Sequence, residues 1–149
     1  MAAEPAFAHI ACCIDDSHAA ARALAHADAL RTLAGGKLTV LHVLPSPAFL
    51  TSLAAGLGGA PVHDVETERE AAEMWLEEQI HGRENAEAVL LEGHPAEAVV
   101  DWAREGGCDV MVAARHSGRV ERVLLGSFSK HLVDHAPCAV LLIPPPEAG

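Results

Sequence analysis

Five short apolar runs alternate with segments of helical periodicity, and this alternation is the feature that most constrains the fold. Each run has the length and the continuous apolar character of a strand that is buried on both faces. Because a helix between two strands returns the chain to the same edge of a sheet, neighbouring strands must run parallel. The sequence therefore predicts one doubly wound α/β domain over residues 1–149, with three layers and a five-stranded parallel sheet. The runs are residues 8–14, 37–44, 86–91, 108–114 and 138–143.

Helix start and stop signals separate these runs. Ser17 can cap a helix over 18–34, and Gly35 can end it in the left-handed conformation that glycine readily adopts. Further helices are expected from about Asp64 to His81, from Pro95 to Gly106, and from Ser127 to about His135.

The second run is expected to stop at Pro45, because proline cannot donate a hydrogen bond to a strand neighbour. A long glycine-containing connection follows, from Pro45 to about Pro61. It is either a lid over a binding site or a surface loop, and the sequence leaves both interpretations open.

Charge and composition exclude several classes of protein. The 149 residues carry a formal net charge of −11, which repels phosphate backbones and disfavours nucleic-acid binding. No segment reaches the run of about 18 apolar residues that a membrane span needs. The stretch from Met1 to Phe7 lacks the basic start of a secretory signal. We therefore expect a cytoplasmic protein that binds neither nucleic acid nor membrane.

The four cysteines all fall inside or beside apolar runs and show no C-x-x-C spacing. Adjacent residues Cys12 and Cys13 should point to opposite faces of a strand. In a reducing cytosol, buried small apolar side chains are favoured over disulfides or a metal site. The other two cysteines are Cys108 and Cys138.

Motifs for metal binding and catalysis are incomplete. His131 and His135 lie four residues apart on one predicted helix, a spacing that can bind a metal. No glutamate follows His131 as in H-E-x-x-H, so we favour two surface or half-buried histidines. The chain has neither a G-x-S-x-G nucleophile turn nor a P-loop. The sequence therefore predicts no metal ligands and no catalytic residues, and we expect a protein that is not an enzyme.

Two loops mark the expected ligand-binding edge, because ligands of open parallel sheets bind beyond the carboxyl ends of the strands. Asp15 follows the first strand and can accept from a ribose hydroxyl or an adenine amino group, or it can be a turn residue. Gly126 and Ser127 open a helix whose free amides attract a phosphate. The alternative is a plain glycine turn with a serine helix cap.

Three segments together resemble the universal stress protein family. They are Ile14-Asp15-Asp16-Ser17, Leu41-His42-Val43, and the block from Leu124-Leu125-Gly126-Ser127-Phe128-Ser129 to Ile143. The resemblance implies a Rossmann-like fold of the adenine nucleotide α-hydrolase type, with strand order 3-2-1-4-5. It also implies a homodimer, formed through the strand at 138–143, whose apolar edge would be exposed in a monomer.

Many members of that family bind ATP through a Gly-x-x-Gly, nine-residue spacer, Gly-Ser/Thr motif. The resemblance places the two leading glycines at Ala113 and His116, so that only Gly126-Ser127 is retained. The absent glycines would let the loop wrap the phosphates with positive backbone dihedrals. The nucleotide-binding candidates that the resemblance implies are Asp15, Val43, His116, Gly126, Ser127, Phe128 and Ser129.

Two functional hypotheses follow. The first is a regulatory stress-response protein that acts as a non-catalytic homodimer, with weak or no ATP binding and with an unidentified protein partner. The second is a sensor that binds ATP or AMP through Asp15 and the Gly126-Ser127 turn and hydrolyses ATP slowly. The loss of both leading glycines favours the first.

Overall fold

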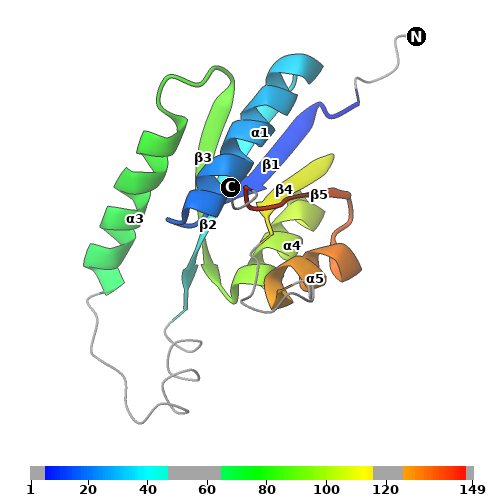
Figure 1. The fold of residues 1–149 in the computed structure, drawn as a ribbon. Coiled ribbons are helices and arrows are strands. Elements are labelled where there is room, and N and C mark those ends of the chain that lie inside the picture. Colours follow the sequence, from blue (N-terminus) through cyan, green and yellow to red (C-terminus); the bar gives the residue numbers. More distant parts are fainter. Residues whose placement is uncertain (1–5, 47–64, 116–125, 147–149) are drawn as a thin grey trace.

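The computed structural model describes residues 6–46, 65–115 and 126–146, and it confirms the α/β fold class. Five parallel strands form one sheet in the order β3-β2-β1-β4-β5, which confirms the strand order that the family resemblance implies (Figure 1). The strands are β1 (His9–Cys13), β2 (Lys37–Pro45), β3 (Ala86–Gly93), β4 (Val110–Ala114) and β5 (Ala139–Ile143).

Helices cover both faces of the sheet. Helices α1 and α3 pack on one face, and α4 and α5 pack on the other. The sheet thus becomes the middle of three layers, as the unbroken apolar runs predict for strands that are buried on both sides. The helices are α1 (His18–Ala34), α3 (Val65–Ile80), α4 (Pro95–Gly106) and α5 (Ser127–His135).

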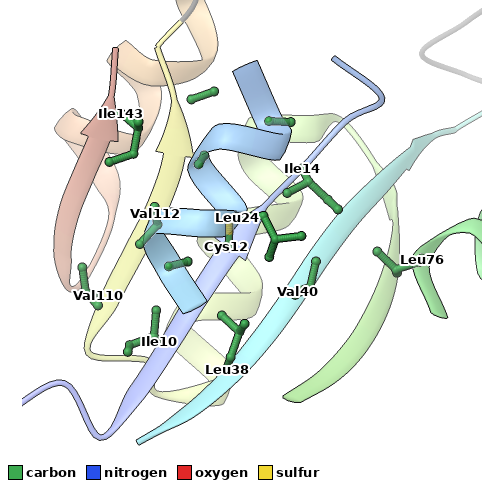
Figure 2. Close-up of a cluster of buried hydrophobic side chains, with 14 residues drawn as sticks. Ile10, Cys12, Ile14, Leu24, Leu38, Val40, Leu76, Val110, Val112 and Ile143 are labelled. Atoms are coloured by element: carbon green, nitrogen blue, oxygen red, sulfur yellow. The ribbon is translucent and has the colours of Figure 1, made fainter. Parts of the chain in front are cut away.

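The core beneath α1 is built from branched side chains of the sheet and small side chains of the helix. Figure 2 shows Leu24 of α1 facing the sheet, with Val40 and Val112 among the strand residues around it. Alanines at 20, 23 and 27 let the helix lie close to the sheet, and all three are buried. The adjacent cysteines divide as predicted: Cys12 belongs to this core, whereas Cys13 packs in the core on the opposite face.

The opposite core depends on the apolar stripe of α4. Residues Ala96, Val99, Val100 and Ala103 recur at helical spacing, and all four are buried, as expected for one face of an amphipathic helix. Leu132 anchors the short helix α5 to this core and is fully buried.

Local capping signals have the predicted roles. The Ser17 side chain accepts a hydrogen bond from the Ala20 amide, 3.1 Å away, and so caps α1. Gly35 and Gly107 end α1 and α4 with φ of 71° and 70°, the left-handed conformation that glycine adopts most easily.

Strand ends differ from the predicted bounds by one or two residues. β3 continues to Gly93, where φ is 133°, a value that side chains rarely tolerate. Pro45 is the last residue of β2 and pairs with Gly93. The predicted connection after Pro45 lies almost entirely outside the described residues.

A buried threonine is satisfied by a chain of side chains at the amino-terminal edge of the sheet. The Thr39 hydroxyl donates to Glu87 Oε1, 2.9 Å away, and accepts from His9 Nε2 at 2.8 Å. The hydrogen bond from Thr39 lowers the pKa of Glu87, and partial burial lowers the pKa of His9. Throughout the described residues, every buried side-chain nitrogen or oxygen has a hydrogen-bond partner.

Truncation of Leu132 tests whether α5 is held by its one apolar anchor. Leu132→Ala should lower the free energy of unfolding by about 2 to 5 kcal/mol, because it leaves a cavity under α5. Its neighbour Val133 is 52 % exposed, so Val133→Ala is a matched control that should cost less than about 0.5 kcal/mol. Urea titration followed by circular dichroism measures both; equal losses would contradict this packing.

Candidate functional site

A pocket of about 290 Å³ opens at the carboxyl ends of β1, β2 and β4. This is the point where the winding of the sheet reverses, since β2 and β3 lie on one side of β1 and β4 and β5 on the other. Open α/β sheets bind their ligands at such a point. The pocket is lined by Cys13, Ile14, Asp15, Ala20, His42, Val43, Pro95, Ala113, Ala114 and Phe128.

Asp15 lines the pocket and also forms a turn, so the turn interpretation is confirmed, and a contact to a ligand stays a prediction. Its Oδ1 accepts a hydrogen bond from the Ser17 amide at 2.9 Å. The residue is exposed, and no other carboxylate is among the described lining residues. A carboxylate can accept hydrogen bonds from hydroxyl or amino groups of a ligand.

Val43 and His42 bring the end of β2 into the same pocket. His42 Nδ1 lies 2.7 Å from the Ile14 carbonyl oxygen; because a carbonyl only accepts, Nδ1 carries the proton. The ring also meets Trp75 of α3 edge to face, with centroids 5.0 Å apart. These contacts fix the ring and its tautomer at the pocket wall.

The first turn of α5 supplies backbone amides beside the pocket. The amides of residues 127–129 have no partner within the helix, because the first internal bond runs from the Lys130 amide to the Gly126 carbonyl at 2.9 Å,. Phe128 lines the pocket. Gly126 and Ser127 are exposed next to it, whereas Ser129 is buried.

The serine-cap interpretation of this turn is wrong. Gly126 occupies the cap position with φ of −58°, and no side chain caps the helix. No described atom lies within 4 Å of a Cβ placed on Gly126. Neither backbone conformation nor packing among the described residues therefore requires glycine there.

Ala113, where the family motif has its first glycine, does not need the backbone freedom of glycine. It lies inside β4, paired with Cys13 on β1 and Leu142 on β5, and its φ is not positive. The expected need for a glycine-only dihedral thus does not arise at this position. Its methyl group instead forms part of the pocket wall. His116, the other substituted position, lies outside the described residues.

Sequence reasoning missed several residues that line the pocket, notably Ile14, His42 and Pro95. Their common signal is position: each lies at or just beyond the carboxyl end of a strand, or at the start of the next helix. Burial raises the pKa of the Cys13 thiol to about 12, so this lining group is a neutral thiol at physiological pH. The pocket walls are thus mostly apolar, with polar groups at Asp15, His42 and the start of α5.

Histidine and acidic side chains do not gather into a metal centre in the part of the chain that the structure describes. The rings of His131 and His135 lie 4.5 Å apart on α5, without a third ligand. Within the same residues, no helix is both long and apolar enough to cross a membrane.

Comparison with known proteins agrees with the fold. The model of the universal stress protein family matches residues 6–144. The chain belongs to the universal stress protein family. A universal stress protein from Thermus aquaticus is 36 % identical over 135 residues, which cover 87 % of this chain and 93 % of the relative.

Two solved structures share the fold. A universal stress protein in complex with cAMP has a TM-score of 0.68 and 20 % identity, over 93 % of this chain and 97 % of the other. The universal stress protein of Archaeoglobus fulgidus in complex with dAMP has a TM-score of 0.66 and 23 % identity, over 93 % and 98 %.

Substitution of Gly126 tests whether a glycine at this position contributes to folding stability. Gly126→Ala should cost less than about 1 kcal/mol of folding free energy, because its dihedral suits alanine. Gly36→Ala is the contrast: the added Cβ would lie 2.6 Å from the Phe7 and Ala8 carbonyl oxygens, and should cost about 1 to 3 kcal/mol. Thermal and urea unfolding compare the two; an equal cost would show that Gly126 is structural.

Proposed function

We propose that this stress-response protein is a non-catalytic regulatory homodimer whose pocket holds an adenine nucleotide with one phosphate more readily than ATP. The observation that carries the proposal is the pocket in which Asp15, Val43 and Phe128 meet beside the first-turn amides of α5. Those groups suit the two ends of such a ligand: a carboxylate for donors on ribose or adenine, and a helix start for phosphate.

Two relatives support the class of ligand. One was solved with cAMP and the other with dAMP, and these ligands share adenine, a sugar and one phosphate. The pocket of about 290 Å³ is at the small end of the usual range for ligand pockets.

The charge of the site favours a small phosphate group over a triphosphate. Among the lining residues that the structure describes, none is a lysine or arginine, and the chain carries a formal net charge of −11. A helix start attracts an anion with only about half an elementary charge, which suits one phosphate better than three. The Ala113 methyl group occupies pocket space that a glycine would leave open.

The described lining residues support a non-catalytic role. General acid–base catalysis needs a titratable group that changes protonation near working pH, within hydrogen-bond reach of the substrate. The Cys13 thiol stays neutral, and the described lining residues include no hydroxyl group that His42 could activate as a nucleophile. Asp15 accepts from the Ser17 amide, which suits binding more than proton transfer.

Calorimetric titration of nucleotide-stripped protein with AMP and ATP tests this proposal. AMP should bind more tightly than ATP, and Asp15→Asn should weaken AMP binding about tenfold, since a charged acceptor becomes neutral. Asp16→Asn is the matched control, because Asp16 is exposed and does not line the pocket. Ala113→Gly should raise the affinity for ATP.

Three results would count against the nucleotide-binding proposal: no binding of either nucleotide, tighter binding of ATP than of AMP, or equal effects of the two aspartate variants. Release of inorganic phosphate from ATP by the purified protein, lost in Asp15→Asn, would instead support the sensor with slow hydrolysis.

The edge strand β5 supports the homodimer. It pairs with β4 on one side and is the last strand of the sheet. In a parallel pair, alternate residues direct their backbone groups to the same side; Ala139 and Ile143 bond toward β4, so Val140 and Leu142 point their backbone groups outward. Leu141 adds an apolar side chain that is 39 % exposed. An open apolar edge of this kind invites pairing with a second chain.

A charge on this edge tests the dimer. Leu141→Lys should convert a dimer, with twice the 15.6 kDa mass of the chain, into a monomer, because edge lysines oppose strand pairing. Leu33 of α1 is 86 % exposed, so Leu33→Lys is the same change on a different surface and should leave the dimer intact. Light scattering after size-exclusion chromatography measures both. A monomeric parent protein at high concentration would disprove the dimer.

A further inference from the structure

Two cysteines from distant parts of the sequence lie side by side at the edge of the sheet opposite the pocket. The Cys108 and Cys138 sulfur atoms are 3.6 Å apart, although the residues are 30 positions apart in the chain. Cys108 precedes β4 and Cys138 precedes β5, and the strands begin with a hydrogen bond from the Ala139 amide to the Asp109 carbonyl at 3.3 Å. Both thiols are free, and both pack against the core under α4 and α5.

We propose that Cys108 and Cys138 form a reversible intramolecular disulfide when the protein meets hydrogen peroxide. A disulfide needs its sulfurs about 2.0 Å apart, so the two atoms must approach by roughly 1.5 Å. Both cysteines lie in irregular segments just before their strands rather than inside them. Gly107, with φ of 70°, precedes Cys108, and Pro137 precedes Cys138.

The two thiols differ in a way that assigns them separate roles. Cys138 is partly exposed, so peroxide can reach its sulfur, whereas Cys108 is buried. Burial raises the pKa of the Cys108 thiol to about 12, which keeps it protonated and slow to react with peroxide. Cys138 is therefore the thiol that peroxide oxidises first, and Cys108 is the thiol that closes the disulfide.

The other cysteines lack this arrangement. Burial raises the pKa of both Cys12 and Cys13 above that of an ordinary thiol, and the two side chains point to opposite faces of β1. They cannot pair with each other without rearrangement of the strand. Oxidation should consequently select one pair of the four thiols.

The chemistry balances with peroxide as the only co-reactant. The Cys138 thiolate attacks one peroxide oxygen, the O–O bond breaks, and a water leaves once the departing hydroxide takes a proton; Cys138 becomes a sulfenic acid. The Cys108 sulfur then attacks the Cys138 sulfur, the S–O bond breaks, and a second water carries away the oxygen with the Cys108 proton. Two thiols and one peroxide give one disulfide and two waters, and a dithiol reverses the change by exchange.

The disulfide would cross-link the two ends of the segment that forms one wall of the pocket. The segment between the two cysteines contains β4, the Gly126-Ser127 turn and α5. Closing a loop of 30 residues lowers the conformational entropy of the unfolded chain, and this stabilises the folded state relative to it. The midpoint of thermal unfolding should therefore rise by about 5 to 10 °C on oxidation.

Peptide mapping tests the pairing directly. Purified protein is treated with hydrogen peroxide, its free thiols are alkylated in denaturant, and the chain is digested with trypsin without reduction. Cleavage at Arg104, Arg115 and Lys130 should give peptide 105–115 joined to peptide 131–149, with Cys12 and Cys13 alkylated. The linked pair should disappear after reduction, and thermal unfolding is compared for the two forms.

Single variants separate the two roles. Cys108→Ala should accumulate a sulfenic acid at Cys138 that dimedone traps, whereas Cys138→Ala should leave Cys108 as a free thiol. Both should lose the rise in unfolding temperature, and Cys12→Ala should retain it. Four intact thiols after peroxide, a disulfide between the Cys138 residues of two chains, or dimedone trapping at Cys108 would each overturn the proposal.

Discussion

The parallel pairing of β1 with β4 is the constraint on which the rest of the structure depends. In this pair Cys13 lies opposite Ala113, and the chain winds outward from it in both directions to β3 and β5. Because all strands run the same way, β1 and β4 end at the same edge of the sheet. The pocket lies at these strand ends, and Phe128 at the start of α5 lines it.

Much of the fold could be predicted because local and global preferences agree. The stripe of Val99, Val100 and Ala103 on α4 is buried as its spacing indicates, and Ser17 and Gly35 bound α1. Strand order could not be predicted in this way, because the apolar runs indicate parallel strands but not which strands are neighbours. The order came from the family resemblance, and only the three-dimensional arrangement reveals that Cys108 lies against Cys138.

The site was harder to predict than the fold, because its residues act through their surroundings. Asp15 was found from its place after a strand, whereas His42 depends on a contact to the Ile14 carbonyl that no spacing reveals. Ala113 shows the opposite problem. The glycine motif suggests a loop with positive backbone dihedrals, but Ala113 lies in a regular strand. Its methyl group therefore reduces the volume of the pocket and does not affect the backbone conformation.

The carboxylate that faces the pocket also begins the sequence of hydrogen bonds that starts α1. Asp15 accepts from the Ser17 amide, and the Ser17 hydroxyl accepts from the Ala20 amide. A ligand that donates a hydrogen bond to Asp15 therefore competes with the Ser17 amide for this carboxylate. Pocket occupancy should be transmitted to the first turn of α1, so that amide hydrogen exchange at Ala20, a buried residue that also lines the pocket, becomes a reporter of what the pocket holds.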